Sequence, residues 1–320
     1  MPDPRPPTLV ADIGGTNTRV ALADGTALRA GTVRRYRNAG FAGLEPVLAS
    51  YLAEQGDPAC AGACVAAAGP VRDGVATLTN LGWTIDGATL ARAARTGRVA
   101  ILNDLQAQGH ALGHLAPEGL RTIVPGPAAP AGAARLVIGI GTGFNAAPVH
   151  ATPGGRVVPP SECGHTTLPV RTDEDLALAR SVGRAHGFAG VEEVLSGRGL
   201  EHLHAFVTGR AGSAAARTAA EIMALIDAGD PAAQETGRAF ARFAGAVAGD
   251  LALVHLPFGG IYLCGGVARA FAVHLGPLGF AAAFRDKGRF SGFMDGFGVQ
   301  VVTDDYAALT GCAAHLAGTG

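Results

Sequence analysis

Residues 9–22, with the sequence LVADIGGTNTRVAL, decide how the rest of the chain is interpreted. Two apolar runs flank an acid, two glycines and a group of small polar residues, and this pattern predicts a β-hairpin. We expect Gly14 and Gly15 to take positive φ angles, with backbone N–H groups directed outward at an anion. Our hypothesis is a nucleotide-phosphate loop, and the alternative is an ordinary tight hairpin.

Side chains around this turn add further polar groups. Thr16, Asn17 and Thr18 supply hydrogen-bond donors. Asp12 stands at the end of the first strand, where its carboxylate is placed to hold a metal ion through water.

Composition limits the class of protein. The chain has 320 residues, of which 48% are hydrophobic, enough for one large domain or two medium ones. Charged residues make up 16% and the net charge is −1, so neither a nucleic-acid partner nor a strongly charged one is indicated. Because no apolar run reaches the roughly 18 residues of a membrane span, and residues 1–7 (MPDPRPP) do not resemble a signal peptide, we expect no membrane association. The five cysteines are scattered, which predicts a reducing cytoplasm.

The remaining pattern alternates strands with helices, which is typical of an α/β protein. Apolar spacings of three and four residues predict helices, and short apolar runs bounded by glycine or proline predict strands. Asp86 is expected to cap the second helix. The main helices are expected over 43–54, 88–95, 105–115, 173–186, 218–225, 233–256 and 306–316, and the main strands over 61–68, 99–102, 259–266 and 299–303.

Asn103 and Asp104 directly follow the buried strand 99–102. Open α/β sheets bind ligands at the carboxyl ends of their strands, so this pair is a candidate ligand site. The alternative is that Asp104 merely caps the following helix, a position that aspartate favours.

A second hairpin is predicted over 136–149, LVIGIGTGFNAAPV, with Gly141, Thr142 and Gly143 in its turn. A dinucleotide fingerprint would need a helix straight after the glycines. The segment 146–149 contains Pro148 and is predicted to be a second strand instead, so a second phosphate hairpin is favoured. The two hairpins indicate two similar α/β halves that each offer a phosphate loop to a shared cleft.

Two later segments carry candidate ligand groups. Glu162 and His165 lie in SECGHTTLP (161–169), where a carboxylate and an imidazole suit sugar hydroxyls. The alternatives are a surface loop, or a metal site with Cys163 that lacks the other ligands of a zinc centre. Gly265 and Gly266 end a strand and would let a flat ring or ribose approach the backbone, the alternative being a plain strand-to-helix turn.

The ordered motifs resemble those of the bacterial ATP-dependent glucokinases, a family of the hexokinase and actin-like ATPase superfamily. The motifs are DIGGTNTR, TN-x-x-W, LNDLQA, GIGTGFN, ECGH, EEVLSGRGL, GGIYLCGG and DKGRF, and the resemblance runs from residue 9 to about residue 316. It implies two RNase-H-like α/β domains flanking a central cleft. We expect a small domain of residues 1–103 plus 303–320 and a large domain of residues 104–302.

The resemblance also implies roles for individual residues. Asp104 would be the catalytic base, and Asp12 would hold Mg²⁺ through water. The sugar hydroxyls would be held by Asn103, Asp104, Glu162, His165 and Glu192. The nucleotide would contact Asp12, Gly14, Gly15, Thr16, Asn17, Gly141, Thr142, Gly143, Gly265 and Gly266. The implied substrates are glucose and ATP, in a homodimeric enzyme of glycolysis.

Departures from the family pattern occur at two positions. Cys163 replaces a glycine of the family's EGGH motif, and Asn145 replaces a glycine of GTGLG. If that position takes a positive φ, asparagine is the residue other than glycine that tolerates it best, so we expect the loop to be retained. Residues 166–175 hold no cysteine, so we expect no structural zinc of the kind found in the related repressor-and-kinase branch.

The predicted reaction is transfer of the γ-phosphoryl group of MgATP to the 6-hydroxyl of glucose. One alternative is a kinase for mannose, fructose or N-acetylglucosamine, because the sugar-binding set reads hydroxyls common to several hexoses. Another is a non-catalytic sugar sensor or an actin-like ATPase of the same fold. The sequence also leaves ATP and polyphosphate open as phosphoryl donors.

Overall fold

The computed structural model describes residues 6–69, 71–78, 81–210 and 216–319, which fall into two compact units. Unit 1 comprises Met1–Pro117, Ala151–Pro159 and Asp304–Gly320, and unit 2 comprises Glu118–His150 and Pro160–Thr303. Thr79 and Asn80 of the TN-x-x-W motif lie outside the described residues, whereas Trp83 is buried.

Unit 1 contains a mixed sheet in the order β3-β2-β1-β5-β9, with β4 also paired to β2. Strands β1, β5 and β9 run parallel, and their register aligns Ile13 with Ala67 and Ala67 with Asn103. The carboxyl ends of the three strands therefore meet at one edge. The strands are β1 (Thr8–Ile13), β2 (Asn17–Asp24), β3 (Ala27–Leu28), β4 (Arg34–Arg37), β5 (Gly62–Ala67) and β9 (Val99–Asn103). A separate small sheet holds β6 (Val71–Arg72), β7 (Val75–Leu78) and β8 (Trp83–Ile85).

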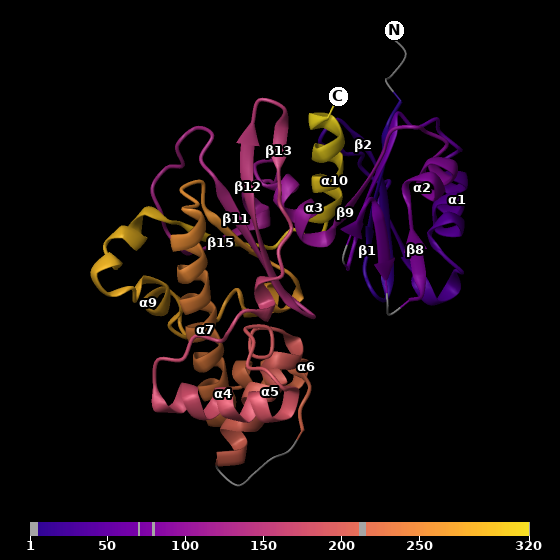
Figure 1. The fold of residues 1–320 in the computed structure, drawn as a ribbon. Coiled ribbons are helices and arrows are strands. Elements are labelled where there is room, and N and C mark those ends of the chain that lie inside the picture. Colours follow the sequence, from indigo (N-terminus) through magenta and orange to yellow (C-terminus); the bar gives the residue numbers. More distant parts are fainter. Residues whose placement is uncertain (1–5, 70, 79–80, 211–215, 320) are drawn as a thin grey trace. The chain divides into compact units, whose positions relative to one another are not determined.

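Two hydrophobic clusters cover opposite faces of this sheet, because successive side chains of a strand point to opposite sides. Leu9 and Ala11 pack in a cluster with α1 (Leu44–Glu54) and α2 (Gly87–Ala94). Val10 packs in another with α3 (Asp104–Ala111) and α10 (Ala307–Gly318). Figure 1 shows α10, drawn in yellow, lying beside α3. The end of the described chain thus completes the core of unit 1.

The observed units differ from the domains expected from sequence. We expected the boundary at Asn103, but α3 stays with unit 1, because α10 packs so closely on it that a methyl group at Gly311 would lie 1.7 Å from the Ala107 carbonyl oxygen. The segment 151–159, which includes all of β13 (Gly155–Val157), also belongs to unit 1. Gln106 of α3 donates to the Val158 carbonyl oxygen at 3.0 Å and ties this segment to the helix.

Unit 2 has its own sheet, in which β10, β15, β14, β11 and β12 are neighbours in that order. Strands β11, β14 and β15 are parallel, whereas β12 returns antiparallel to β11 as the second predicted hairpin. The strands are β10 (Leu120–Val124), β11 (Arg135–Ile140), β12 (Phe144–Thr152), β14 (Ile261–Cys264) and β15 (Val299–Val302).

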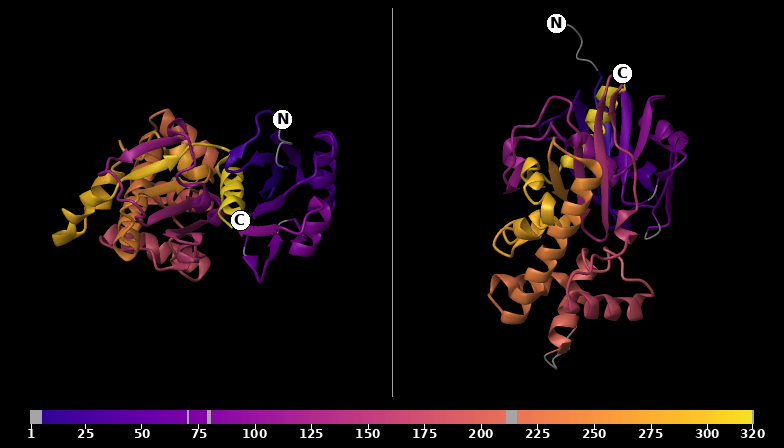
Figure 2. Two further views of the ribbon diagram at one scale, coloured as in Figure 1. Left: turned by 90° about the horizontal axis from the view of Figure 1, so that it is seen from above. Right: turned by 60° about the vertical axis from the view of Figure 1, so that its left-hand side comes forward.

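Helices enclose the large hydrophobic core of unit 2. The long helix α7 (Pro231–His255), orange in Figure 2, is capped by Asp230 and packs against its neighbours α5 and α9. The other helices of the unit are α4 (Asp173–His186), α5 (Gly197–Arg210), α6 (Ala219–Asp227), α8 (Gly266–Phe271) and α9 (Phe280–Arg285). Short 3₁₀ turns along the chain are Asn38–Gly40, Pro117–Gly119, Cys163–His165, Gly288–Phe290 and Phe293–Gly296.

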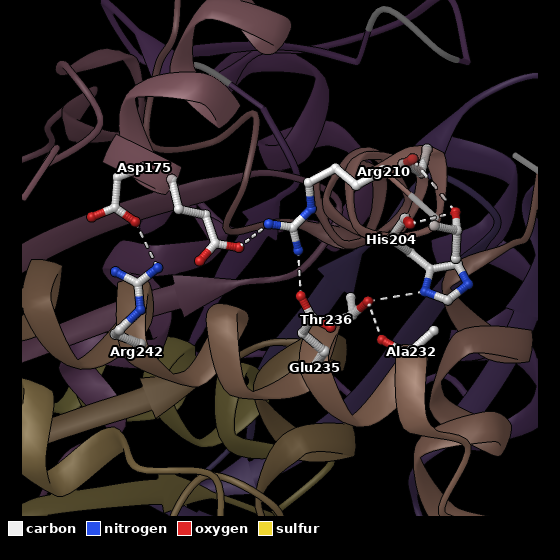
Figure 3. Close-up of polar contacts among 10 residues, drawn as sticks. Asp175, His204, Arg210, Ala232, Glu235, Thr236 and Arg242 are labelled. Carbon is white, nitrogen blue, oxygen red and sulfur yellow. Dashed lines mark hydrogen bonds and ion pairs between the residues drawn. The ribbon is translucent and has the colours of Figure 1, made fainter. Parts of the chain in front are cut away.

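Polar contacts link α4, α5 and α7 (Figure 3). Arg210 at the end of α5 bonds both Glu174 of α4 and Glu235 of α7. Arg242 of α7 donates to the buried Asp175 at 2.6 Å. The buried His204 ring lies 2.9 Å from the Thr236 hydroxyl. These contacts fix the three helices against one another.

Predicted helix starts are also tested by the structure. Asp86 caps α2, its carboxylate accepting from the Thr89 amide at 2.7 Å, as expected.

Among the described residues, no helix has the length and apolar character needed to cross a bilayer.

Candidate active site

The first predicted hairpin is present as β1 and β2, with Gly15 and Thr16 exposed at its tip. Gly14 N–H donates to the Asn17 carbonyl oxygen at 3.0 Å and closes the turn. The predicted positive φ angles are wrong, because neither Gly14 nor Gly15 has one. A methyl group added at Gly15 would meet nothing within 4 Å, so the glycine there leaves open space rather than relieving backbone strain.

A buried asparagine that we did not predict fixes this turn. Asn38 donates through Nδ2 to the Gly14 carbonyl oxygen at 2.7 Å, and its own N–H donates to the Thr16 carbonyl oxygen at 2.9 Å. Its Oδ1 accepts from the Thr18 hydroxyl at 2.8 Å. Thr18 therefore supports the turn from inside. A single asparagine after a short strand has no periodic pattern that would have revealed this role.

Two carboxylates lie at the same sheet edge of unit 1. Asp12, near the end of β1, accepts from Arg19 Nη1 at 3.2 Å. Asp104 begins α3 at the end of β9. Although Asp104 is accessible to solvent, partial loss of hydration among the surrounding atoms raises its pKa to about 6, and the negative charge of Asp12 adds to this rise.

The helix cap at this edge is Asn103, so the alternative in which Asp104 merely caps the helix is wrong. Asn103 Oδ1 accepts from Gln106 N–H at 2.6 Å, while Gln106 Oε1 accepts from Asn103 N–H at 3.1 Å. This reciprocal pair is a capping box. Asp104 instead accepts from the neighbouring Leu105 N–H at 2.8 Å, which orients its carboxylate.

Unit 2 brings its predicted nucleotide residues together at the carboxyl ends of β11 and β14. A methyl group at Gly141 would lie 3.8 Å from the Gly266 amide nitrogen. Gly265 has φ +97°, and a methyl group there would lie 2.4 Å from the Ile140 carbonyl oxygen. Gly265 is therefore required by the strand-to-helix turn itself, whereas Gly266 faces open space.

Glu192 binds the second hairpin rather than standing free. Its Oε2 accepts from Phe144 N–H at 2.9 Å, and a methyl group at Gly143 would lie 2.6 Å from that oxygen. Its Oε1 lies 3.6 Å from Arg198. Glu192 N–H also donates to the Gly164 carbonyl oxygen at 2.9 Å, so Glu192 joins the hairpin to the predicted sugar segment. Sequence spacing could not show this contact between distant positions.

The ECGH segment rests directly on β12. A methyl group at Gly164 would lie 2.1 Å from the Phe144 carbonyl oxygen, so only glycine fits. Glu162 and His165 are exposed on one 3₁₀ turn, in which His165 N–H donates to the Glu162 carbonyl oxygen at 3.1 Å. The structure therefore places these two predicted residues side by side.

The two departures from the family pattern contact each other. Asn145 does not adopt a positive φ but lies in β12 opposite Gly139. Its Oδ1 accepts from Cys163 N–H at 3.2 Å, and its Nδ2 bonds the Ser161 carbonyl oxygen and lies 3.4 Å from Glu162 Oε2. Asn145 is thus a hydrogen-bonding centre of the 161–163 segment. Burial raises the pKa of the Cys163 thiol, which stays neutral at pH 7.

Each unit therefore gathers its own share of the predicted residues. Unit 1 holds Asp12, the turn 14–17, Asn103 and Asp104 at one sheet edge, and unit 2 holds the turn 141–143, Gly265, Gly266, Glu162, His165 and Glu192.

Comparisons with known proteins agree with these motifs. The family model described as Glucokinase matches residues 9–319. The curated glucokinase of Cupriavidus metallidurans is 33% identical, with 97% of this chain and 93% of that protein covered. A crystal structure of glucokinase from an Antarctic psychrotroph matches with TM-score 0.86 and 33% identity, covering 97% of this chain and 98% of the other.

A more distant solved structure shares the fold. The glucokinase from Streptomyces griseus, of the ROK family and in complex with glucose and AMPPNP, matches with TM-score 0.62 and 18% identity, covering 98% of this chain and 100% of the other. The two α/β units thus have the actin-like ATPase fold of the glucokinase and ROK proteins. The chain belongs to the glucokinase family and is an enzyme that phosphorylates a hexose.

Proposed function

We propose that this enzyme transfers the γ-phosphoryl group of ATP to the 6-hydroxyl of glucose, with Asp104 as the base. The observation that carries the proposal is the position of Asp104: an oriented carboxylate at the same sheet edge as the hairpin β1–β2, with its pKa raised to about 6. A base with a pKa near the working pH is both ionised and able to accept a proton.

Positioning is the main task in phosphoryl transfer, since the transition state is loose and carries little covalent chemistry. Asn103, held rigid by its capping box, would offer its amide to a sugar hydroxyl. Glu162 and His165 would contact further hydroxyls from their shared 3₁₀ turn. Glu192 supports this set, because its carboxylate already accepts the Phe144 N–H. Asp104 would take the 6-hydroxyl proton as the new bond to phosphorus forms.

Nucleotide phosphates would bind at glycine turns that leave room for them. The exposed tip of the first hairpin has open space at Gly15, and Gly141 and Gly266 lie together in unit 2. Backbone N–H groups and the side chains of Thr16, Asn17 and Thr142 would donate to phosphate oxygens. Gly14 and Gly143 would shape the two turns, and Gly265 would bring the backbone close to the adenosine.

The residues of unit 1 also fit a magnesium ion. Asp12 is an oxygen ligand at the edge where the ATP phosphates are proposed to bind, and Mg²⁺ characteristically keeps several waters and uses one or two carboxylates. Arg19 holds the Asp12 carboxylate in place at 3.2 Å. When bound with ATP, the ion would neutralise phosphate charge.

The test is ADP release by the purified protein across glucose, mannose, fructose and N-acetylglucosamine, with ATP and polyphosphate as donors. We expect glucose with ATP to give the highest kcat/KM. Sugar binding without turnover would instead indicate a sensor, and ATP hydrolysis that does not depend on sugar would indicate an ATPase; either outcome overturns the proposal.

We also propose that the protein acts in glycolysis as a cytoplasmic homodimer. Its five cysteines are all free thiols, which agrees with a reducing compartment. Sedimentation velocity with and without glucose would measure the oligomeric state, and a single monomeric species would contradict the dimer.

A further inference from the structure

We propose that His186, Glu193 and His202 form a binding site for a divalent transition-metal ion. One ring nitrogen of each histidine and one carboxylate oxygen lie within 4.8 Å of one another. His186 ends α4, His202 lies in α5, and Glu193 belongs to the segment between the two helices. The three residues therefore converge from one helix–loop–helix segment of unit 2.

The carboxylate of Glu193 is directed at both imidazole rings. Its Oε2 lies 3.9 Å from His186 Nδ1 and 3.6 Å from His202 Nδ1, and the two rings stack with centroids 4.3 Å apart. The other oxygen, Oε1, faces Arg198 at 3.4 Å. Arg198 thus orients the carboxylate and leaves Oε2 toward the histidines.

Oε2 of Glu193 lacks a hydrogen bond. This atom is buried, and no described residue donates to it. A buried acceptor without a donor destabilises the folded protein, so a bound cation would satisfy an oxygen that the protein leaves without a partner. His186 is exposed, which gives an ion a route to the group from solvent.

The chemistry of the donors selects the class of ion. Two imidazoles and one carboxylate suit Zn²⁺, Co²⁺, Ni²⁺ or Cu²⁺, whereas Mg²⁺ and Ca²⁺ prefer oxygen ligands alone. Ligands around tetrahedral zinc lie about 3.4 Å apart, given bonds of about 2.1 Å. Closing the group around an ion therefore needs movements of about 1 Å, within reach of side-chain rotation.

The surrounding scaffold keeps the three ligands close. Arg210 ties the end of α5 to the start of α4 and to α7, at the opposite end of the helix pair from His186. In the same network, Asp175 of α4 accepts from Arg242 of α7, and His204 of α5 contacts the hydroxyl of Thr236 of α7 (Figure 3). Because the helices are fixed, an ion would need only the side-chain movements described above. The Nδ1 atom of His202 also lies 3.2 Å from the Glu193 backbone carbonyl oxygen, so an ion bound at that nitrogen would displace this contact. The inference does not depend on the proposed reaction.

The test is a Co²⁺ titration of the full-length, chelator-treated protein, followed by visible d–d absorption and by calorimetry. We expect binding of one ion by the wild type, and affinity at least about tenfold weaker in His186→Ala, His202→Ala and Glu193→Gln. The matched control is His274→Ala, which removes another histidine of unit 2 that pairs with a carboxylate, Asp227, at 2.8 Å.

Thermal unfolding supplies a second readout that is independent of activity. Zn²⁺ should raise the Tm of the wild type and of the control, and should raise it less in the three variants, whose Tm without metal confirms that they fold. Three outcomes would overturn the site: no binding by the wild type, equal Co²⁺ affinity in all variants, or a thiolate charge-transfer band that identifies a cysteine ligand.

Discussion

A methyl group at Gly15 would meet no atom within 4 Å, whereas one at Gly143 would lie 2.6 Å from the Glu192 carboxylate. The two glycines lie in the turns of two hairpins of similar sequence, Gly15 in the middle of its turn and Gly143 directly before β12. In unit 1 the turn is supported from inside by Asn38, and its tip is open. In unit 2 the turn is filled from outside by a side chain that arrives from residue 192.

The difference separates two physical reasons for a glycine-rich turn. Gly15 leaves open space that a ligand can occupy, whereas Gly143 leaves space that the Glu192 carboxylate already fills. We infer that the first turn leaves open space for a ligand, whereas the second turn and Glu192 hold one another in place.

The largest effect is expected at the open edge, for Asp104→Asn. Loss of the base should lower kcat by about 10²–10⁴-fold, the usual contribution of a general base. The matched control is Asp24→Asn, which removes a carboxylate of the same unit that pairs with Arg29 at 2.8 Å and should keep wild-type kcat. Steady-state kinetics measures both, and near-wild-type turnover by Asp104→Asn would disprove the assignment of the base.

The pH dependence of the wild type should report the same carboxylate. The pKa of Asp104 is raised to about 6, so kcat/KM should fall about tenfold per pH unit below that value. In the unfolded chain the pKa of aspartate is about 3.9, so between about pH 4 and pH 6 the native state binds more protons at this carboxylate than the unfolded state does. This group therefore lowers the stability progressively from about pH 4 to pH 6, and by a constant amount above pH 6.

The stability half of this prediction can be measured separately. The Tm of Asp104→Asn relative to the wild type should rise between pH 4 and pH 6 and then stay level. A relative Tm that falls over this range would mean that the charged form of Asp104 is favoured in the native state.

The glycine pair tests the comparison itself. Gly143→Ala should lower the free energy of unfolding by about 1–3 kcal/mol, because the added methyl overpacks against Glu192. Gly15→Ala is the matched substitution and should change stability by no more than about 0.5 kcal/mol, while raising the KM for ATP. Urea unfolding and kinetics measure the two effects. Equal stabilities would remove the distinction between the open and the filled turn.

The smallest effect is expected for Asn145→Ala in unit 2. The change removes the partner of Cys163 N–H and of the Ser161 carbonyl oxygen, which would loosen the segment that carries Glu162. A loss of about 1 kcal/mol in the free energy of glucose binding corresponds to a KM for glucose that is about fivefold higher. The KM for ATP should be unchanged. A rise in the KM for ATP alone would show that the asparagine serves the phosphate turn instead.

Local patterns predicted much of the fold. Both hairpins, the strand β9 and the cap at Asp86 follow from residues that are close in sequence, where side-chain periodicity and capping chemistry act, although only Leu102 of β9 is fully buried. The register across β5 places Asn103 and Asp104 at the same sheet edge as the carboxyl end of β1, although the expected domain boundary had separated Asp104 from the first hairpin. Parallel strands bring their carboxyl ends together whatever lies between them.

Contacts between distant residues could not be predicted in this way. The domain boundary depends on the close approach of Gly311 to Ala107, and the first turn depends on Asn38. The bond from Phe144 to the Glu192 carboxylate is of the same kind. The positive φ angles expected at Gly14 and Gly15 were wrong because a sequence of two glycines permits such angles without requiring them.

The packing of α10 on unit 1 has a consequence for synthesis of the chain. Cys312 of α10 donates to the Ala11 carbonyl oxygen of β1 at 3.7 Å, across 301 residues. A ribosome must therefore translate all of unit 2 before the first strand can find its covering helix. During translation one apolar face of the emerging amino-terminal sheet lacks α10, so we expect it to be the stretch of nascent chain that most needs a chaperone.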